Sequence, residues 1–302
     1  MKKFIVCCVA LLSLGLVSGC GSSSTPSEAP AHKTKVAVSF DAMKELVQAV
    51  GGDKVEITSI IPDGTEPHEF EPTPQQMKIL HSTDVFVKQG LGMEPWAEAM
   101  EKAADNAKLT VINASKDVPA IANTDEDEIK EHGQYDPHAW LSLSCAQIEV
   151  KNIAAGLAKA DPANAAYYQK NAEAYNGKLQ ELLTEYQNKF KGISKKEFVT
   201  GHAAFAYLCR DFGLEQNSVE SVFASGQPSA KQMADLVDFC RKHNVKTVFV
   251  EEMVSPKTSE TLAKEVGASV KEIHTLESSE GGATYLDRMK ENLQMIYDSL
   301  KA

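Results

Sequence analysis

Short runs of β-branched residues alternate with helical segments along the chain after Lys35, and this alternation is the strongest constraint on the fold. The expected strands cover residues 36–39, 55–60, 84–88, 109–112, 198–201, 218–223, 247–251 and 270–273. The expected helices cover residues 41–49, 73–81, 95–104, 144–160, 204–212, 229–243, 255–266 and 285–300. Short connections between alternating strands and helices require parallel strands covered by helices on both faces. The sequence therefore predicts the α/β class, with ligand-binding loops at the carboxyl ends of the strands.

One long helical segment interrupts this alternation near the middle of the chain. Asp161 and Pro162 are typical of a helix start, and Gly192 of a helix end. Apolar residues recur between them at steps of three or four: Tyr168, Ala172, Tyr175, Leu179, Leu182, Tyr186 and Phe190. Roughly thirty residues at 1.5 Å each make a rod of about 45 Å, which is longer than one small lobe needs. A coiled-coil seam is the alternative, but the stripe covers too few heptads to favour it.

A chain of 302 residues is long enough for two domains. We therefore expect two lobes, each with a mostly parallel sheet flanked by helices, joined by one long rigid helix. The first lobe would cover residues 34–160, the linking helix residues 161–192 and the second lobe residues 193–302.

The first residues are typical of a secretory signal. Lys2 and Lys3 precede a nearly apolar stretch from Phe4 to Val17, which is short for a bilayer span. The stretch ends in Leu-Val-Ser-Gly-Cys at residues 16–20, which resembles a bacterial lipobox. This resemblance implies that residues 1–19 are removed and that Cys20 carries a lipid. Residues 20–33, rich in Ser and Pro, would then be a flexible tether to the outer face of the cytoplasmic membrane of a bacterium. An ordinary signal peptide with an incidental cysteine is the alternative.

The net charge and the spacing of the cysteines argue against a nucleic-acid ligand, a disulfide scaffold and a thiolate metal site. With 31 Lys and Arg against 42 Asp and Glu, the net charge of −11 argues against a nucleic-acid partner, because few cations could replace the counterions of a phosphate backbone. Outside the leader and Cys20 the chain keeps Cys145, Cys209 and Cys240. An odd number at wide spacing is neither a disulfide scaffold nor a thiolate metal site. We expect buried apolar residues, with a single disulfide as the alternative.

Three histidines lie in short motifs on expected loops of the two lobes. Pro67-His68-Glu69 follows the strand 55–60, Asp136-Pro137-His138 precedes the helix 144–160, and Gly201-His202-Ala203 follows the strand 198–201. Two of the three have a proline before them, which stiffens the backbone there. A single histidine of this kind is usually a surface or hydrogen-bonded residue. Three in equivalent positions favour metal binding, because neutral imidazole is the commonest metal ligand.

With the lipobox and the long helix, these motifs resemble the zinc/manganese family of ABC-transporter substrate-binding lipoproteins over about residues 33–302. The resemblance implies that two α/β lobes hold one metal ion between them and deliver it to an ABC permease and its ATPase subunit. It implies ligands at His68, His138 and His202, and a fourth at a late carboxylate in a Leu-Asp-Pro-Leu-like stretch. The matching stretch here reads Leu-Glu-Ser-Ser at residues 276–279, so Glu277 is the candidate and Glu251, at the end of a strand, its rival. We expect a monomer that is not an enzyme.

The nature of the ligands favours zinc. Three neutral imidazoles and one carboxylate make a site of charge −1, and four N/O ligands suit tetrahedral Zn²⁺, whereas Mn²⁺ prefers more oxygen. The resemblance adds that a histidine at the third position, here His202, is typical of zinc carriers. Transport of Mn²⁺ or Fe²⁺ is the alternative within the same role. Because each imidazole must be deprotonated, affinity should fall as the pH drops through about 6.5.

Other residues near the motifs have secondary roles in this interpretation. Glu71 and Asp136 are candidates to accept the second ring N–H of a ligand histidine, and Glu251 would do so if it is not a ligand. Residues 124–133 are acidic and contain His132. They form either a solvated loop or, by resemblance, a weak metal-capturing arm.

Two further function classes are alternatives. A secreted zinc hydrolase would need an open metal position and a general base, often in a His-Glu-x-x-His motif, and no second histidine follows His68 and Glu69 at that spacing. A surface adhesin is the other class.

Overall fold

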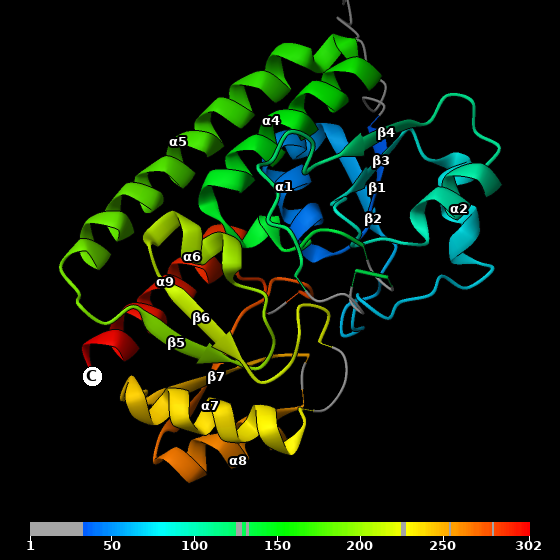
Figure 1. The fold of residues 1–302 in the computed structure, drawn as a ribbon. Coiled ribbons are helices and arrows are strands. Elements are labelled where there is room, and N and C mark those ends of the chain that lie inside the picture. Colours follow the sequence, from blue (N-terminus) through cyan, green and yellow to red (C-terminus); the bar gives the residue numbers. More distant parts are fainter. Residues whose placement is uncertain (1–32, 125–128, 131–132, 225–227, 254, 280) are drawn as a thin grey trace, which may run out of the picture. The chain divides into compact units, whose positions relative to one another are not determined.

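The computed structural model describes residues 33–124, 129–130, 133–224, 228–253, 255–279 and 281–302. Residues 33–302 form one compact unit, drawn in Figure 1. Cys20, the tether up to residue 32 and His132 lie outside the described residues. No helix of the described ranges has both the length and the apolar character that crossing a bilayer requires.

The first lobe is built on a parallel sheet with the strand order β2-β1-β3-β4. Its elements are β1 (Thr34–Val38), α1 (Asp41–Gly51), η1 (Gly52–Lys54), β2 (Val55–Ser59), η2 (Gln76–Ser82), β3 (Val85–Lys88), α2 (Ala97–Ala103), β4 (Thr110–Asn113), η3 (Ala139–Leu141) and α4 (Leu143–Ala160), where η marks a 3₁₀ helix. Helices α1 and α4 pack on one face of this sheet, and η2 and α2 lie on the other (Figure 1).

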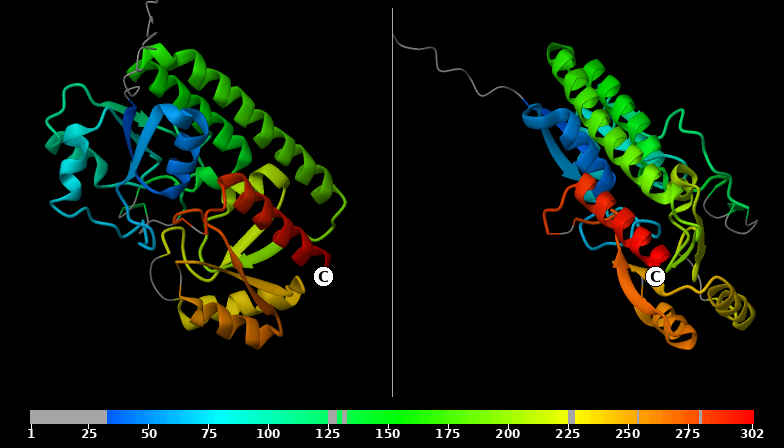
Figure 2. Two further views of the ribbon diagram at one scale, coloured as in Figure 1. Left: turned by 180° about the vertical axis from the view of Figure 1, so that it is seen from behind. Right: turned by 90° about the vertical axis from the view of Figure 1, so that its left-hand side faces the viewer.

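The second lobe repeats the arrangement with the order β6-β5-β7-β8, again all parallel. Its elements are β5 (Glu197–Thr200), α6 (Ala206–Phe212), β6 (Glu215–Ser218), α7 (Ala230–Lys242), β7 (Thr247–Glu251), α8 (Pro256–Val266), β8 (Ser269–Ile273) and α9 (Tyr285–Lys301). Helices α6 and α9 cover one face, and α7 and α8 the other (Figure 2). Two parallel sheets flanked by helices confirm the predicted fold class.

The predicted long helix is present as α5 (Ala165–Lys191), preceded by the single 3₁₀ turn η4 (Pro162–Asn164). Its 27 residues make a rod of about 40 Å. It packs on α4 and α1 in the first lobe and on α6 and α9 in the second. Asn171 donates to the Val50 carbonyl of the first lobe (2.9 Å), and Gln187 to the Asp211 carbonyl of the second (3.1 Å). The first part of the helix therefore contacts the first lobe and its last part contacts the second, so that the helix joins the two.

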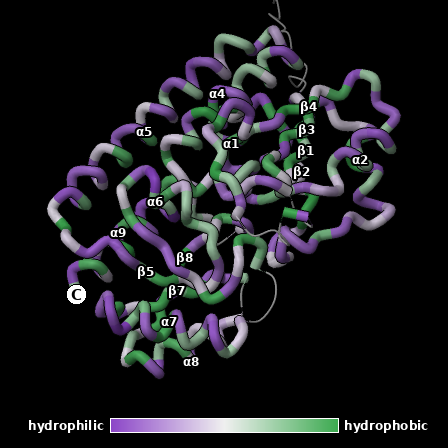
Figure 3. Tube along the Cα trace, in the orientation of Figure 1, coloured by the Kyte–Doolittle hydropathy of each residue, from purple (hydrophilic) through white to green (hydrophobic). Residues whose placement is uncertain are grey.

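The apolar core is continuous between the lobes. One cluster of buried side chains runs from β1 and α1 through the inner face of α5 to α6, β7 and α9. Figure 3 shows this pattern as hydrophobic residues on the central strands and hydrophilic residues along the outer side of α5. Cys145, Cys209 and Cys240 are buried and free, as expected.

Two elements differ from the sequence prediction. Segment 73–81, expected as an α-helix, is the 3₁₀ helix η2, and the Asn106 amide donates to the carbonyls of Leu80 and Thr83 at its end. The strand expected at 218–223 lies earlier, at Glu215–Ser218, because it pairs with β5 from Glu197 to Thr200. This edge strand reads Glu-Gln-Asn-Ser, so the apolar pattern that marks a buried strand is missing from it.

Candidate metal centre

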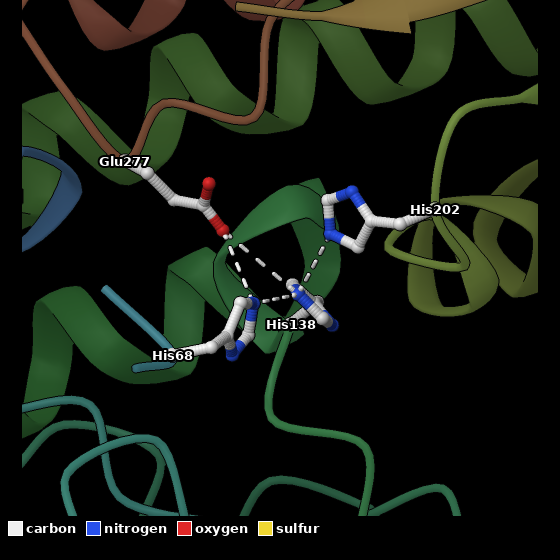
Figure 4. Close-up of side chains that lie close together, drawn as sticks. All are labelled: His68, His138, His202 and Glu277. Carbon is white, nitrogen blue, oxygen red and sulfur yellow. Dashed lines mark hydrogen bonds and ion pairs between the residues drawn. The ribbon is translucent and has the colours of Figure 1, made fainter. Parts of the chain in front are cut away.

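Four side chains from four separate loops point toward one another at the junction of the lobes (Figure 4). His68, His138, His202 and Glu277 are all buried, and one ligand atom of each lies within 4.8 Å of the other three. The Nε2 atoms of His68 and His138 are 3.2 Å apart, and those of His138 and His202 are 3.4 Å apart. The Oε1 atom of Glu277 is 3.5 Å from Nε2 of His68 and 3.9 Å from Nε2 of His138.

Three of these separations, 3.2, 3.4 and 3.5 Å, lie close to the edges of a small coordination tetrahedron, and the fourth, 3.9 Å, is longer. With metal–ligand bonds of about 2.0–2.1 Å, tetrahedral Zn²⁺ separates its ligands by about 3.3–3.4 Å. At this distance the lone pairs of facing imidazole nitrogens repel each other unless a cation lies between them. Among the described residues the buried Oε1 of Glu277 has no hydrogen-bond donor. The donor set therefore fits one divalent cation.

His68 is presented by the loop that follows β2. Pro67 precedes it, and the Glu66 carboxylate accepts the backbone N–H groups of His68 (3.0 Å) and Glu69 (2.8 Å). This local turn aims the ring at the centre of the cluster. The sequence predicts a supporting role for Glu71. The structure leaves Glu71 exposed, with no hydrogen bond to His68 in the described part of the chain. Glu66 holds the backbone instead, and its place two residues before His68 is the signal that could have identified it.

His138 is fixed by the carboxylate two residues before it. Oδ1 of Asp136 accepts both the backbone N–H (2.9 Å) and the ring Nδ1–H (2.8 Å) of His138. A ring that donates from Nδ1 to a carboxylate keeps its Nε2 lone pair free, so the tautomer suits metal binding. The structure places Asp136 where the sequence predicted a supporting carboxylate.

His202 and Glu251 lie where β5 and β7 diverge, at the carboxyl ends of the two central strands of the second sheet. Parallel sheets bind ligands at this position. Oε1 of Glu251 accepts the backbone N–H of His202 (3.1 Å) and lies 3.5 Å from its Nδ1. Glu251 is thus behind the His202 ring, while Glu277 faces the cluster. A Cβ atom at Gly201 would lie 2.0 Å from Oε2 of Glu251, so this carboxyl group needs the glycine.

Glu277 lies on the loop between β8 and α9. Its Oε2 atom accepts a hydrogen bond from the Thr275 hydroxyl (2.8 Å), which leaves Oε1 directed at the histidines. Of the two rival carboxylates, Glu277 is therefore the one with the geometry of a ligand.

Burial and neighbouring charges shift the pKa values of the groups in and beside the cluster in different directions. Burial opposes ionisation of Glu277, but the His68 ring 3.5 Å away and the other two imidazoles outweigh it and lower the pKa of this carboxyl group to about 2. Burial also opposes protonation of His68, yet the Glu277 carboxylate raises the pKa of this ring above its ordinary value. Burial and the neighbouring His138 lower the pKa of His202 to about 3. Burial raises the pKa of Glu251 to about 8, so this group adds no negative charge at neutral pH.

Comparison with known proteins agrees with this geometry. Residues 36–299 match the family described as zinc-uptake complex component A, periplasmic.

The chain belongs to this family. Members are solute-binding proteins of ABC transporters, which work with a permease and an ATPase, and they are not enzymes.

Among individual relatives, a Treponema pallidum (strain Nichols) protein whose name ascribes metal binding to it is 42% identical, covering 95% of this chain and 94% of its own length. The high-affinity zinc uptake system protein ZnuA of Bacillus subtilis (strain 168) is 38% identical, over 94% of each chain. The solved structure of the laminin binding protein of Streptococcus agalactiae, described as bifunctional with adhesin and metal transporting activity, superimposes with a TM-score of 0.80. It is 34% identical, covering 88% of this chain and 99% of that one.

Proposed function

We propose that this chain is the extracytoplasmic solute-binding protein of an ABC importer, that it captures Zn²⁺ with His68, His138, His202 and Glu277, and that it delivers the ion to the membrane permease. The observation that carries this proposal is the spacing of the four ligand atoms, all within 4.8 Å of one another and all buried. Capture by neutral imidazoles and one carboxylate leaves a site of charge +1, and the Asp136 carboxylate behind the His138 ring lies next to it.

Zinc is the ion best suited to this geometry. Three nitrogens and one carboxylate oxygen, four protein ligands in all, suit tetrahedral Zn²⁺, whereas Mn²⁺ and Fe²⁺ take more oxygen ligands at higher coordination numbers. All four positions around the ion are taken by protein groups, which suits holding an ion rather than hydrolysis at an open metal position.

Elemental analysis tests the ion and the site together. The purified, metal-stripped protein is dialysed against equal concentrations of Zn²⁺ and Mn²⁺, and bound metal is measured by mass spectrometry. We expect about one Zn²⁺ per chain and almost no Mn²⁺. His202→Ala should lose most of the zinc, whereas His81→Ala, the same change at an exposed histidine outside the cluster, should retain it. Preferential uptake of Mn²⁺, or full zinc occupancy in the His202 variant, would contradict the proposal.

The proposal extends to the anchoring of the chain. Residues 1–19 would be the signal peptide, Cys20 the lipid-bearing first residue and residues 20–33 the tether, with the mature protein a monomer on the outer face of the cytoplasmic membrane. Labelling cells with a radioactive fatty acid should mark the wild-type protein but not Cys20→Ser. The variant should then accumulate unprocessed or be released into the medium. Equal labelling of the two would reject the anchor.

The lobes at residues 34–160 and 193–302 would each contribute to the binding of one ion. An adhesin role, which is part of the description of the Streptococcus agalactiae protein, has no observation in this structure that favours it over transport.

A further inference from the structure

The loop that carries Glu277 belongs to the second lobe by sequence but is hydrogen-bonded to the first. Among its described residues, three hydrogen bonds join its backbone or side chains to the first lobe: Asp41 N to Glu277 O (3.4 Å), Gly64 N to Ser278 Oγ (2.8 Å) and Trp140 Nε1 to Thr275 O (2.8 Å). Glu277 is thus held against the lobe that carries His68 and His138.

Arg288 lies at the centre of these contacts. It is in the first turn of α9, 1% exposed, and its guanidinium donates to the Asp41 carboxylate (Nη2 to Oδ2, 2.5 Å) and to the Ser278 carbonyl (Nη1 to O, 2.7 Å). Asp41 opens α1 in the first lobe, and its backbone N–H donates to Glu277 itself. One planar side chain therefore connects the first lobe to the residue that follows the candidate ligand.

The backbone before Glu277 shows that the loop is held in place. Leu276 is fully buried and has a φ of +60°, in the left-handed region that non-glycine residues seldom adopt. Such a conformation persists only where surrounding contacts over-determine it. The contacts on both sides of Leu276 are those of Thr275 with Trp140 and of Ser278 with Arg288.

Stability alone gives a weak account of this arrangement. A buried ion pair loses much of its Coulomb energy to desolvation, and apolar side chains of similar volume often stabilise a fold equally well. A guanidinium also fixes geometry, because its planar group of N–H donors holds two acceptors at defined positions relative to each other. In this structure those acceptors are an anchor in the first lobe and the backbone next to Glu277.

We propose that Arg288, anchored by Asp41, is a positioning residue that holds the Glu277 carboxylate in the metal centre. The inference rests on the proposed function, since it assigns Arg288 a role in binding of the same ion. Without Arg288 the loop can relax from its left-handed turn, and the ion keeps three imidazoles and a water in place of the carboxylate. Removing a group that orients a metal ligand lowers metal affinity by about 10–100-fold.

The test compares Arg288→Met with Arg241→Met in the full chain. Arg241 also pairs with a carboxylate, Glu265 at 2.7 Å, but this pair is exposed and lies away from the centre. Zn²⁺ affinity is measured by competition with a fluorescent chelator, and the coordination by the visible spectrum of Co²⁺ bound to the same site. We expect Arg288→Met to weaken zinc binding by about 10–100-fold and to change the Co²⁺ spectrum. Arg241→Met should change neither.

A double-mutant cycle with Glu277→Gln separates positioning from general destabilisation. If Arg288 acts through Glu277, Arg288→Met should change the affinity by less than about twofold in the Glu277→Gln background. The full loss in that background, or no loss in the wild type, would overturn the proposal.

Two further variants keep the test decisive if Arg288→Met fails to fold. Arg288→Lys keeps the charge without the planar fork and should weaken binding to an intermediate degree. Arg288→Met combined with Asp41→Asn leaves no unpaired buried charge, and should show the weak affinity and the changed Co²⁺ spectrum. Wild-type affinity in a folded double variant would reject the inference. Failure of the wild-type protein itself to bind zinc would reject the proposed function, so the two failures are distinguishable.

Discussion

Each histidine of the centre has a different partner, and the partner determines how its ring titrates. Asp136 holds the ring of His138 from behind, whereas the Glu277 carboxylate faces His68 from within the cluster. The carboxyl group of Glu251 lies 3.5 Å from Nδ1 of His202, but burial raises its pKa to about 8 and it carries little charge at neutral pH. Burial therefore governs His202, and its pKa falls to about 3. Protons therefore compete with the metal mainly at His68 among the rings with shifted pKa values.

Zinc affinity should accordingly fall as the pH drops through the raised pKa of His68, which lies above 6.5. A raised pKa means that the protonated His68–Glu277 pair stabilises the metal-free protein below about 6.5, and that this stabilisation is lost above the raised pKa. Glu277→Gln removes the carboxylate, so burial should lower the pKa of His68 and move the loss of affinity to lower pH. Chelator competition between about pH 5.5 and 8.5 measures both curves. An unchanged onset in the variant would contradict the assignment.

Gly201 is required by the close approach of the Glu251 carboxyl group, so a side chain at this position should disturb the support of His202. In Gly201→Ala the new methyl group would meet Oε2 of Glu251 at 2.0 Å. The carboxyl group must move, and with it the hydrogen bond that holds the backbone of His202. We expect a loss of zinc affinity of about tenfold or more, measured by calorimetry. Gly177→Ala is the matched control, because nothing lies within 4 Å of the corresponding position; equal affinities in the two variants would refute the role of Gly201.

At the scale of elements, α5 follows its sequence pattern closely, while two shorter elements do not. The seven apolar positions of the stripe face the core, with only Tyr175 half-buried. In a helix of this length, apolar residues at helical spacing mark the buried face in every turn or two, so the sequence pattern is clear. The edge strand β6 has only four polar residues, and its position is set by pairing with β5. The 3₁₀ helix η2 is ended by Asn106, which lies far along the chain.

Gly177 lies in the interior of α5, with open space where the Cβ atom of another residue would lie. Gly177→Ala should raise the free energy of unfolding by about 0.5–1 kcal/mol, because glycine loses more backbone entropy in a helix than alanine does. Urea unfolding of the metal-free protein measures the difference. Gly213→Ala is the opposite case, since Gly213 ends α6 with a φ of +64°, and it should lower the stability. A destabilised Gly177→Ala would show that α5 is not an ordinary helix at this point.

At the scale of the molecule, direct contacts near the metal centre reinforce the link that α5 makes between the lobes. Two tyrosines of the second lobe donate to carbonyls of the first, Tyr207 Oη to Asp136 O (2.7 Å) and Tyr285 Oη to Trp140 O (2.5 Å). In the opposite direction, Ser142 Oγ donates to Oδ2 of Asp211 (2.7 Å). A rigid helix and contacts of this kind oppose hinge bending of the lobes.

We therefore expect the metal-free and zinc-loaded proteins to give nearly superimposable small-angle X-ray scattering curves. Rearrangement on binding would be confined to loops and side chains around the ion. Gly177→Pro should interrupt α5 and allow the two curves to diverge, because proline removes a helical hydrogen bond and clashes with the preceding turn. A large compaction of the wild-type protein on zinc binding would refute this rigidity.

The α/β class, the long helix and the three histidines follow from the sequence alone, because periodicity and local motifs are properties of short segments. Glu277 was an expectation with Glu251 as its rival, and the choice between them depends on which carboxylate the fold turns toward the rings. The left-handed turn at Leu276 and the exposure of Glu71 are features of the folded chain that no local motif marks. The contact between Arg288 and Asp41 joins residues 247 positions apart. Only the packing of the two lobes decides such contacts, since no local pattern records which distant side chain will meet another.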